Sequence, residues 1–135
     1  MKYFAVLLFL FSIFLCNCKT IQDMTYQYAD GSGNLYVISN KTIHYKPITT
    51  KESSSGEYSG GNETIIDITE SIFTEIKSLI EKAINNKAIH IENRVMMSGL
   101  IVIVNKNDKK TIIIKPNCLE QSEIESYLHK ILHKQ

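Results

Sequence analysis

The sequence predicts an α+β domain in which two helices pack on an antiparallel sheet of about four to six strands. Short β-branched and aromatic runs, bounded by turn residues, occur in the first half of the chain and again after residue 99. Two longer segments carry apolar residues at helical spacing. The chain has 135 residues, which is enough to bury one hydrophobic core. The predicted order of elements is β-β-β-α-(β)-β-β-α.

Three strands are predicted in the first part of the domain. Residues 26–28 alternate at strand spacing, and the turn cluster at residues 30–34 leads to a returning strand at residues 35–38. A second turn leads to a third strand at residues 42–46. Pro47 then ends the ladder, because proline has no amide hydrogen to donate.

A polar loop and a helix are predicted next. Residues 48–64 carry almost no large apolar side chains and are rich in serine and glycine, so they are expected to form a loop. From Asp67 to residues 85–86 the apolar period becomes helical, and the stripe is wide enough to pack on a sheet. Asp67 and Glu70 have the spacing of a capping box at the start of this helix.

A β-hairpin is predicted after an ambiguous segment at residues 88–97. Within that segment Ile89 and Ile91 fit a strand, but polar residues interrupt the alternation. The β-branched runs at residues 100–104 and 111–114 are joined by a polar turn, as in a hairpin. Because these runs are unbroken, they predict central strands whose two faces are both largely covered.

The last predicted element is a second amphipathic helix. Asn117 is placed to cap it, with Glu120 as its third residue. Its apolar face is expected to comprise Leu119, Ile124, Tyr127, Leu128 and Ile131.

The first eighteen residues have the pattern of a secretion signal that ends in a lipidated cysteine. Lys2 supplies the positive charge, and the apolar run at residues 4–15 is shorter than the roughly 20 residues that span a bilayer. Leu15-Cys16-Asn17-Cys18 fits cleavage before an acylated cysteine better than the small-residue site of an ordinary signal peptide. Cys18 is the predicted lipid attachment site, since bulky residues precede Cys16.

Cleavage there would divide the chain into a signal peptide (1–17), a lipidated tether (18–25) and a single domain (26–135) with a loop at residues 48–64. More than one acyl chain on one cysteine would anchor the protein stably to a membrane. Lys2 would be removed with the signal peptide, so the 15 basic and 14 acidic residues of the whole chain would become equal in number in the mature protein. A balanced charge argues against nucleic-acid binding, which needs clustered Lys and Arg.

The signal and two polar clusters resemble those of a known class of bacterial protein. Asn17 before the cysteine resembles the permissive lipoboxes of Bacteroidota and spirochaetes. The clusters Asp30-Gly-Ser-Gly-Asn34 and Ser53-Ser-Ser-Gly-x-Tyr58 resemble small Bacteroidota-type lipoproteins that have no assigned activity. The resemblance implies a lipid-anchored protein of the cell envelope. Residues 19–23 match a surface-export signal poorly, so the periplasmic leaflet of the outer membrane is the expected location.

Two features of the sequence are candidates for a metal site or a reactive thiol. Residues 30–34 place oxygen ligands at positions 1, 3 and 5 of a calcium loop, but Leu35 and Lys41 stand where an EF-hand needs Gly and Glu, so a hairpin turn is expected. Cys118 would be the only cysteine left after acylation of Cys18. It is expected to be a buried, inert thiol.

A histidine pair on the last predicted helix is a further candidate for metal binding. His129 and His133 are four residues apart and therefore share one helix face. A metal would need a third ligand, such as His44, His90 or a carboxylate, and Lys130 stands where a metalloprotease carries Glu. No metal or other cofactor is predicted.

The serine- and glycine-rich loop is the predicted binding element. An aromatic side chain among small polar residues is typical of adaptable recognition loops, and the candidate binding residues are Ser53, Ser54, Ser55 and Tyr58. A serine nucleophile here would need a nearby base, and the loop has no Gly-x-Ser-x-Gly elbow.

Three classes of function are compatible with the sequence. The first is a non-enzymatic envelope lipoprotein that contacts a protein partner through the 51–62 loop. The second is an inhibitor or immunity-type protein that blocks a toxin or peptidase with the same loop. The third is a small hydrolase in which a loop serine works with His44 or His90.

Overall fold

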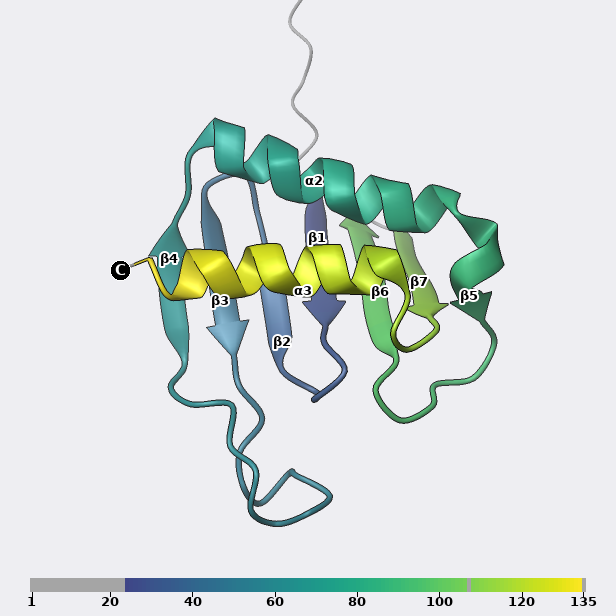
Figure 1. Ribbon diagram of the computed structural model, residues 1–135. Helices are drawn as coiled ribbons and strands as arrows, with labels where there is room; N and C mark the ends of the chain where they lie inside the picture. Colours follow the sequence, from purple (N-terminus) through teal and green to yellow (C-terminus); the bar gives the residue numbers. More distant parts are fainter. Residues whose placement is uncertain (1–23, 107, 135) are drawn as a thin grey trace, which may run out of the picture.

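The computed structural model describes residues 24–106 and 108–134 (Figure 1). The predicted signal peptide, Cys18 and most of the predicted tether lie outside these residues. Within the described part of the chain, no helix is both long enough and apolar enough to cross a membrane.

Seven strands form one antiparallel sheet in the order β4-β3-β2-β1-β6-β7-β5, and two long helices pack on it. This confirms the predicted α+β class, with slightly more strands than expected. The strands are β1 (Thr25–Ala29), β2 (Leu35–Ile38), β3 (Thr42–Lys46), β4 (Thr64–Asp67), β5 (His90–Ile91), β6 (Gly99–Asn105) and β7 (Asp108–Ile114). The helices are α2 (Glu70–Asn85) and α3 (Leu119–Leu132), with a 3-10 turn, η2 (Lys87–Ile89), after α2.

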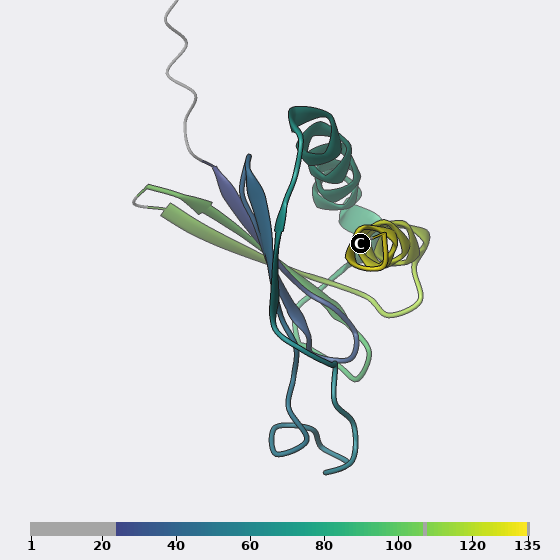
Figure 2. The same ribbon diagram turned by 90° about the vertical axis from the view of Figure 1, so that its left-hand side faces the viewer.

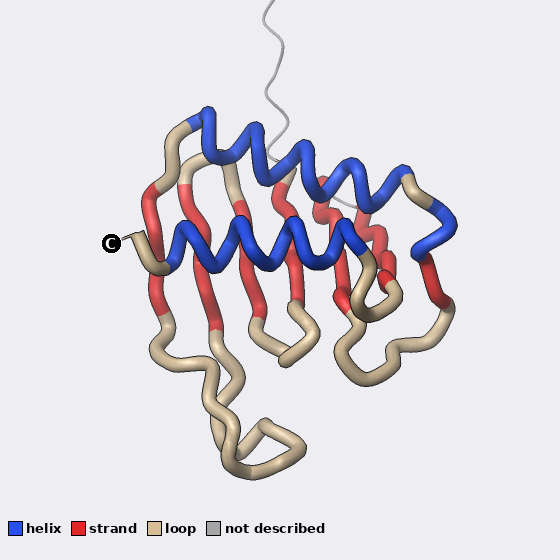
Figure 3. Tube along the Cα trace, in the orientation of Figure 1, coloured by secondary structure: helices blue, strands red, loops and turns tan. Residues whose placement is uncertain are grey.

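Both helices lie on the same face of the sheet and run across the strands (Figures 1 and 3). Figure 2 shows the resulting two layers from the side. Because side chains alternate along a strand, one face of each strand points toward the helices and supplies the core. The largest fully buried apolar side chains of this core are Tyr26, Tyr28, Ile38, Ile43, Ile76, Ile80, Ile101, Ile114, Ile124 and Leu128.

A row of tyrosines crosses the helix-facing side of three neighbouring strands. The strand register pairs Tyr28 with Tyr36 and Tyr36 with Tyr45. Their ring centroids are 6.4 Å apart for the first pair and 4.9 Å for the second. The row therefore lies at right angles to the strands.

The predicted start of the first helix was wrong. Residues 64–67 form the edge strand β4, in which Ile66 pairs with Ile43 and is buried. The helix cap is Thr69, whose side chain accepts a hydrogen bond from the amide of Ile72 at 3.3 Å. Asp67 belongs to the strand, so the expected capping box with Glu70 does not form.

The predicted cap of the last helix was one residue too early. Cys118 is the N-cap and makes no side-chain capping bond. Asn117 has a left-handed backbone with φ of 59°, a conformation that asparagine tolerates better than most residues. Its amide donates to Gln121 Oε1 at 3.0 Å, so the helix reaches back to the preceding turn.

The expectation that both faces of the hairpin strands are largely covered was only partly right. Strand β6 is interior to the sheet, but no described element covers the face opposite the helices (Figure 2). On that face Leu100 and Val104 are partly exposed, whereas Val102 between them is buried. In the ambiguous segment only His90–Ile91 pairs as a strand, with Ile113 and Ile114.

The two ends of the sheet differ. Met24 and the turn at residues 39–41 line a small pocket at the end where β1 begins. The turn at residues 30–34 and the loop at residues 47–63 extend from the opposite end (Figure 1). The chain therefore enters the domain at one end and forms its longest loop at the other.

Candidate binding site

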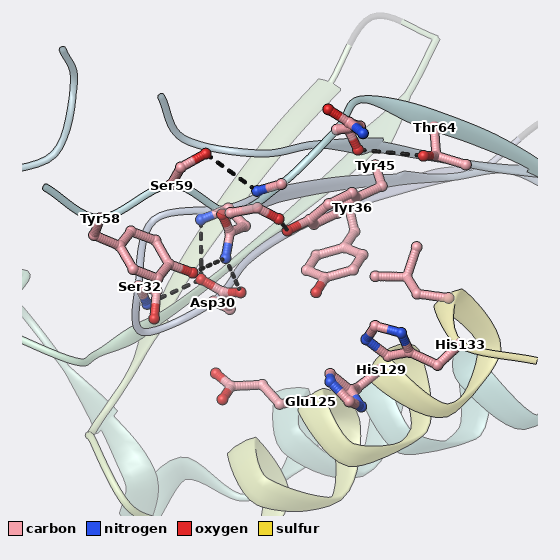
Figure 4. Close-up of a pocket in the computed structure, with 15 residues that line it drawn as sticks. Asp30, Ser32, Tyr36, Tyr45, Tyr58, Ser59, Thr64, Glu125, His129 and His133 are labelled. Carbon is pink, nitrogen blue, oxygen red and sulfur yellow. Dashed lines mark hydrogen bonds between the residues drawn. The ribbon is translucent and has the colours of Figure 1, made fainter. Parts of the chain in front are cut away.

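A cleft of about 550 Å³ lies between the C-terminal half of α3 and the loop end of the sheet (Figure 4). Three groups of residues come together there: the ends of strands β2 to β4, the turn after β1 with the loop before β4, and one face of α3. The lining residues are Asp30, Ser32, Asn34, Tyr36, Tyr45, Tyr58, Ser59, Gly60, Gly61, Asn62, Thr64, Glu125, His129, Leu132 and His133.

Two tyrosines of the cross-strand row form the sheet side of the cleft. The hydroxyl of Tyr45 donates to the carbonyl oxygen of Gly60 at 2.7 Å and so fixes the loop to β3. Burial raises the pKa of Tyr45 to about 12, with smaller contributions from Tyr58 and Asp30. The side chain of Tyr36 points into the cleft (Figure 4), and its hydroxyl makes no hydrogen bond with any described residue. Burial, and then the neighbouring Asp30, raise the pKa of Tyr36 above its ordinary value, so it stays a neutral phenol.

Asp30 and Asn34 form a buried polar hub that joins the turn to the loop. Asp30 Oδ1 accepts the amides of Ser32 and Asn34, both at 2.9 Å, and Asp30 Oδ2 accepts Asn34 Nδ2 at 2.8 Å. Asn34 Nδ2 also donates to the Tyr58 hydroxyl at 3.0 Å, and Asn34 Oδ1 accepts the amide of Ile48 at 3.1 Å. The calcium-loop pattern therefore acts as a hairpin turn that positions the loop.

Glu125 links α3 to the end of β1. Its Oε1 accepts the hydroxyl of Tyr28 at 2.9 Å, the amide of Gly31 at 3.2 Å and Gln121 Nε2 at 2.9 Å. Burial, and then the Glu125 charge, raise the pKa of the Tyr28 hydroxyl, which therefore remains a donor. Within the described part of the chain, Glu125 Oε2 makes no hydrogen bond, and it is the oxygen left for a ligand.

His129 and His133 lie on the cleft-facing side of α3, with ring centroids 4.0 Å apart. The other histidines lie elsewhere: His44 Nε2 is 2.5 Å from Glu63 Oε1, and His90 Nε2 is 2.9 Å from the carbonyl oxygen of Ala83. Among the described residues, no three His, Cys, Asp or Glu side chains are grouped to hold a metal ion. His44 and His90 therefore do not join His129 and His133 at one site.

The predicted binding residues divide into two groups. Ser53 Oγ and Ser55 Oγ are 3.0 Å apart, and Ser55 Oγ accepts the amide of Tyr58 at 3.3 Å, so these serines fold the loop on itself. Neither they nor the exposed Ser54 line the cleft. Tyr58 does line it and is 41% exposed. No loop serine shares a hydrogen bond with a histidine among the described residues.

Gly60 holds the loop close to the domain. A Cβ atom at this position would overlap Asn34 Oδ1 and would lie 2.8 Å from Pro47 Cβ. A glycine is therefore required for the close approach of the loop to the polar hub. Residues 59–62 form the loop side of the cleft; they lie within the 51–62 loop predicted from the sequence, but were not among its named candidate binding residues.

Tyr36 and Tyr45 were predicted only as strand residues, and no binding role was predicted for them or for Glu125. One available signal was Glu125 itself, a charged residue directly beside the apolar stripe of the last helix. Cys118 is buried, as expected from the sequence. No protein-family model, curated protein or solved structure matches this chain.

Proposed function

We propose that this protein is a non-enzymatic binding protein of the cell envelope, anchored to the outer membrane through a lipid on Cys18, that contacts a protein partner with the 51–62 loop and the adjoining cleft. The observation that carries the proposal is the construction of the cleft. Its walls come from a strand row, a polar turn and a helix, and Tyr58 is held beside the opening by Asn34.

The chemistry of the lining supports recognition. Tyrosines supply large contact areas with few rotatable bonds, and small polar residues supply adaptable hydrogen bonds. Here Tyr36 and Tyr45 are fixed by burial in the sheet, whereas Tyr58 is on the exposed loop. A rigid base with an exposed aromatic rim is well suited to hold a segment of another protein.

The position of the cleft supports display away from a membrane. Cys18 precedes Met24, and β1 runs from the Met24 end of the sheet toward the cleft end (Figure 1). Strand β1 has 5 residues, so it separates the two ends by roughly 16 Å at about 3.3 Å per residue. An anchor on Cys18 would therefore leave the cleft accessible to a partner.

The anchor is tested by the intact mass of the protein extracted from native membranes, compared with a Cys18→Ala variant. We expect a chain that begins at Cys18 and carries added acyl mass, and we expect the variant to lose that mass. An unacylated wild-type chain would overturn the anchor and the envelope location inferred from it.

The binding surface is tested by site-specific photo-crosslinking in the native cell. A crosslinking residue at Asn62, which lines the cleft, is compared with one at Ser78, which is exposed on α2. We expect a discrete protein adduct from position 62 only, and we expect Tyr58→Ala to abolish it. No adduct at position 62, or the same adducts at both positions, would contradict the proposal.

A further inference from the structure

We infer that the cleft takes a positively charged side chain, lysine or arginine, presented by the partner protein. This inference rests on the proposed function and adds the chemical class of the group that is bound. The charges of the lining, a hydroxyl that faces the cleft without an internal partner, and two neighbouring tyrosine rings support it independently.

The charges in the cleft favour a cation. The lining contains the carboxylates of Asp30 and Glu125 and neither lysine nor arginine. Asp30 uses both of its oxygens in the turn, but Glu125 has one oxygen without an internal partner. Arg94 donates to the backbone oxygen of Asp30 at 3.5 Å and is not part of the lining. An anionic ligand would therefore meet like charges here.

Tyr36 supplies a polar group that lacks an internal partner. Its side chain is only 6% exposed, yet its hydroxyl points into the cleft (Figure 4). Among the described residues, this hydroxyl is not one of the fully buried polar atoms that lack a partner, so it reaches the open space of the cleft and can bind a ligand or water there. An ammonium or guanidinium group could donate to the Tyr36 oxygen and to Glu125 Oε2 across the same space.

The tyrosine rings accommodate the rest of such a side chain. Tyr36 and Tyr45 have ring centroids 4.9 Å apart, with the ring planes tilted by 44°, and both line the cleft. Lysine and arginine pack their methylene stems on apolar surface while their charged ends remain solvated or paired. A cation near the face of a tyrosine is also attracted by the electron-rich ring.

The test uses the full chain in solution at pH 8 and low salt, and neutral-ended Gly-x-Gly peptides in which x is lysine, arginine, norleucine or glutamate. Binding is followed by NMR chemical-shift titration. We expect lysine or arginine to bind about ten times more tightly than norleucine, since charge-assisted hydrogen bonds are stronger than neutral ones.

Two variants locate the binding group. Tyr36→Phe removes only the unpartnered hydroxyl, and Glu125→Gln removes the charge but keeps an amide oxygen in its place. Each is expected to weaken lysine or arginine binding by about fivefold or more. Tyr127→Phe is the matched control, because the Tyr127 hydroxyl bonds to Glu75 outside the cleft. The control should bind as the unmodified chain does.

The outcomes separate this inference from the proposed function. Equal binding of lysine, arginine and norleucine, or tighter binding of glutamate, would overturn the inference, and a crosslink at Asn62 would still support the proposed function. Cation binding that is unchanged in Tyr36→Phe and Glu125→Gln would place the cation elsewhere and would also overturn it. If a variant fails to fold, the inference is judged by how tightly the lysine, arginine, norleucine and glutamate peptides bind to the unmodified chain.

Discussion

The two helices cover the same face of the sheet, but their buried faces differ in chemistry. The buried residues of α2 are all apolar, namely Ile76, Ile80 and Ala83. The buried face of α3 includes Glu120 and Gln121. One turn further along, Glu125 begins the face of α3 that lines the cleft. We conclude that α2 serves as a cover for the core, whereas α3 is both a cover and a wall of the candidate site.

Three polar residues on the inward side of α3, Glu120, Gln121 and Glu125, have partners from distant parts of the chain. Glu120 accepts a hydrogen bond from Asn86 at 2.7 Å, and Gln121 Nε2 donates to the carbonyl oxygen of Met97 at 2.8 Å. Glu125 bonds to the end of β1. Satisfied buried polar networks favour a single arrangement, because any displacement leaves the groups unpaired. The position of α3 is therefore more narrowly specified than apolar packing alone would require.

The largest expected effect on stability comes from a substitution in the apolar buried face of α2. Ile80→Ala on α2 should lower the free energy of unfolding by about 2–5 kcal/mol, because the side chain is completely buried and leaves a cavity. Urea denaturation measures the change. Ser78→Ala, at an exposed position of the same helix, is the control and should change stability little. A loss below about 1 kcal/mol for Ile80→Ala would mean that the core refills the cavity.

The polar side is tested by Glu125→Leu. This change leaves the Tyr28 hydroxyl and the Gly31 amide without their acceptor, at an expected cost of about 1–3 kcal/mol. The conservative Glu125→Gln keeps an acceptor oxygen and should cost less in the same denaturation experiment. Equal stability of both variants and the unmodified chain would show that these hydrogen bonds do not hold α3 to the sheet.

The loop wall of the cleft is tested by Gly60→Ala. The added methyl group overlaps Asn34 Oδ1, so the loop should separate from the polar hub. Limited proteolysis should then cut residues 48–63 several times faster than in the unmodified chain. Gly56→Ala is a control for the glycine change, because no atom lies within 4 Å of a Cβ at that position, although its positive φ adds strain. Equal cleavage of Gly60→Ala and the unmodified protein would contradict the close contact.

The smallest expected effect concerns the start of α3 and depends on pH. The hydrogen bond from Asn86 holds the pKa of the Glu120 carboxyl below its ordinary value. The ionised group therefore stabilises the fold fully above its unfolded pKa, and this contribution is lost as the pH falls through the lowered folded pKa. Glu120→Gln should therefore lower Tm slightly at pH 7, where the ionised group contributes, and change Tm least at acid pH, so that the dependence of Tm on pH becomes flatter. An identical acid profile would exclude this role for Glu120.

Much of the fold follows from local patterns in the sequence. The alternation at residues 26–46, the β-branched hairpin and the helical stripe of α2 correctly predicted strands and helices, because each pattern repeats over several residues. Strand β4 was missed for a physical reason. It is four residues long and follows a polar loop, and it is stabilised as a strand by its pairing with β3, in which the buried Ile66 lies opposite Ile43. The cap at Thr69 depends on where that strand ends.

The sequence by itself determined the α+β class, the loop with Tyr58 and the burial of Cys118, because hydrophobic spacing and turn chemistry act over short separations. The tertiary structure decided the site. Tyr36 and Glu125 are far apart in the sequence, and they line one cleft only because the strand register places the tyrosine row beneath α3. Neither residue type nor spacing encodes that contact, since it depends on how the helix layer packs on the sheet.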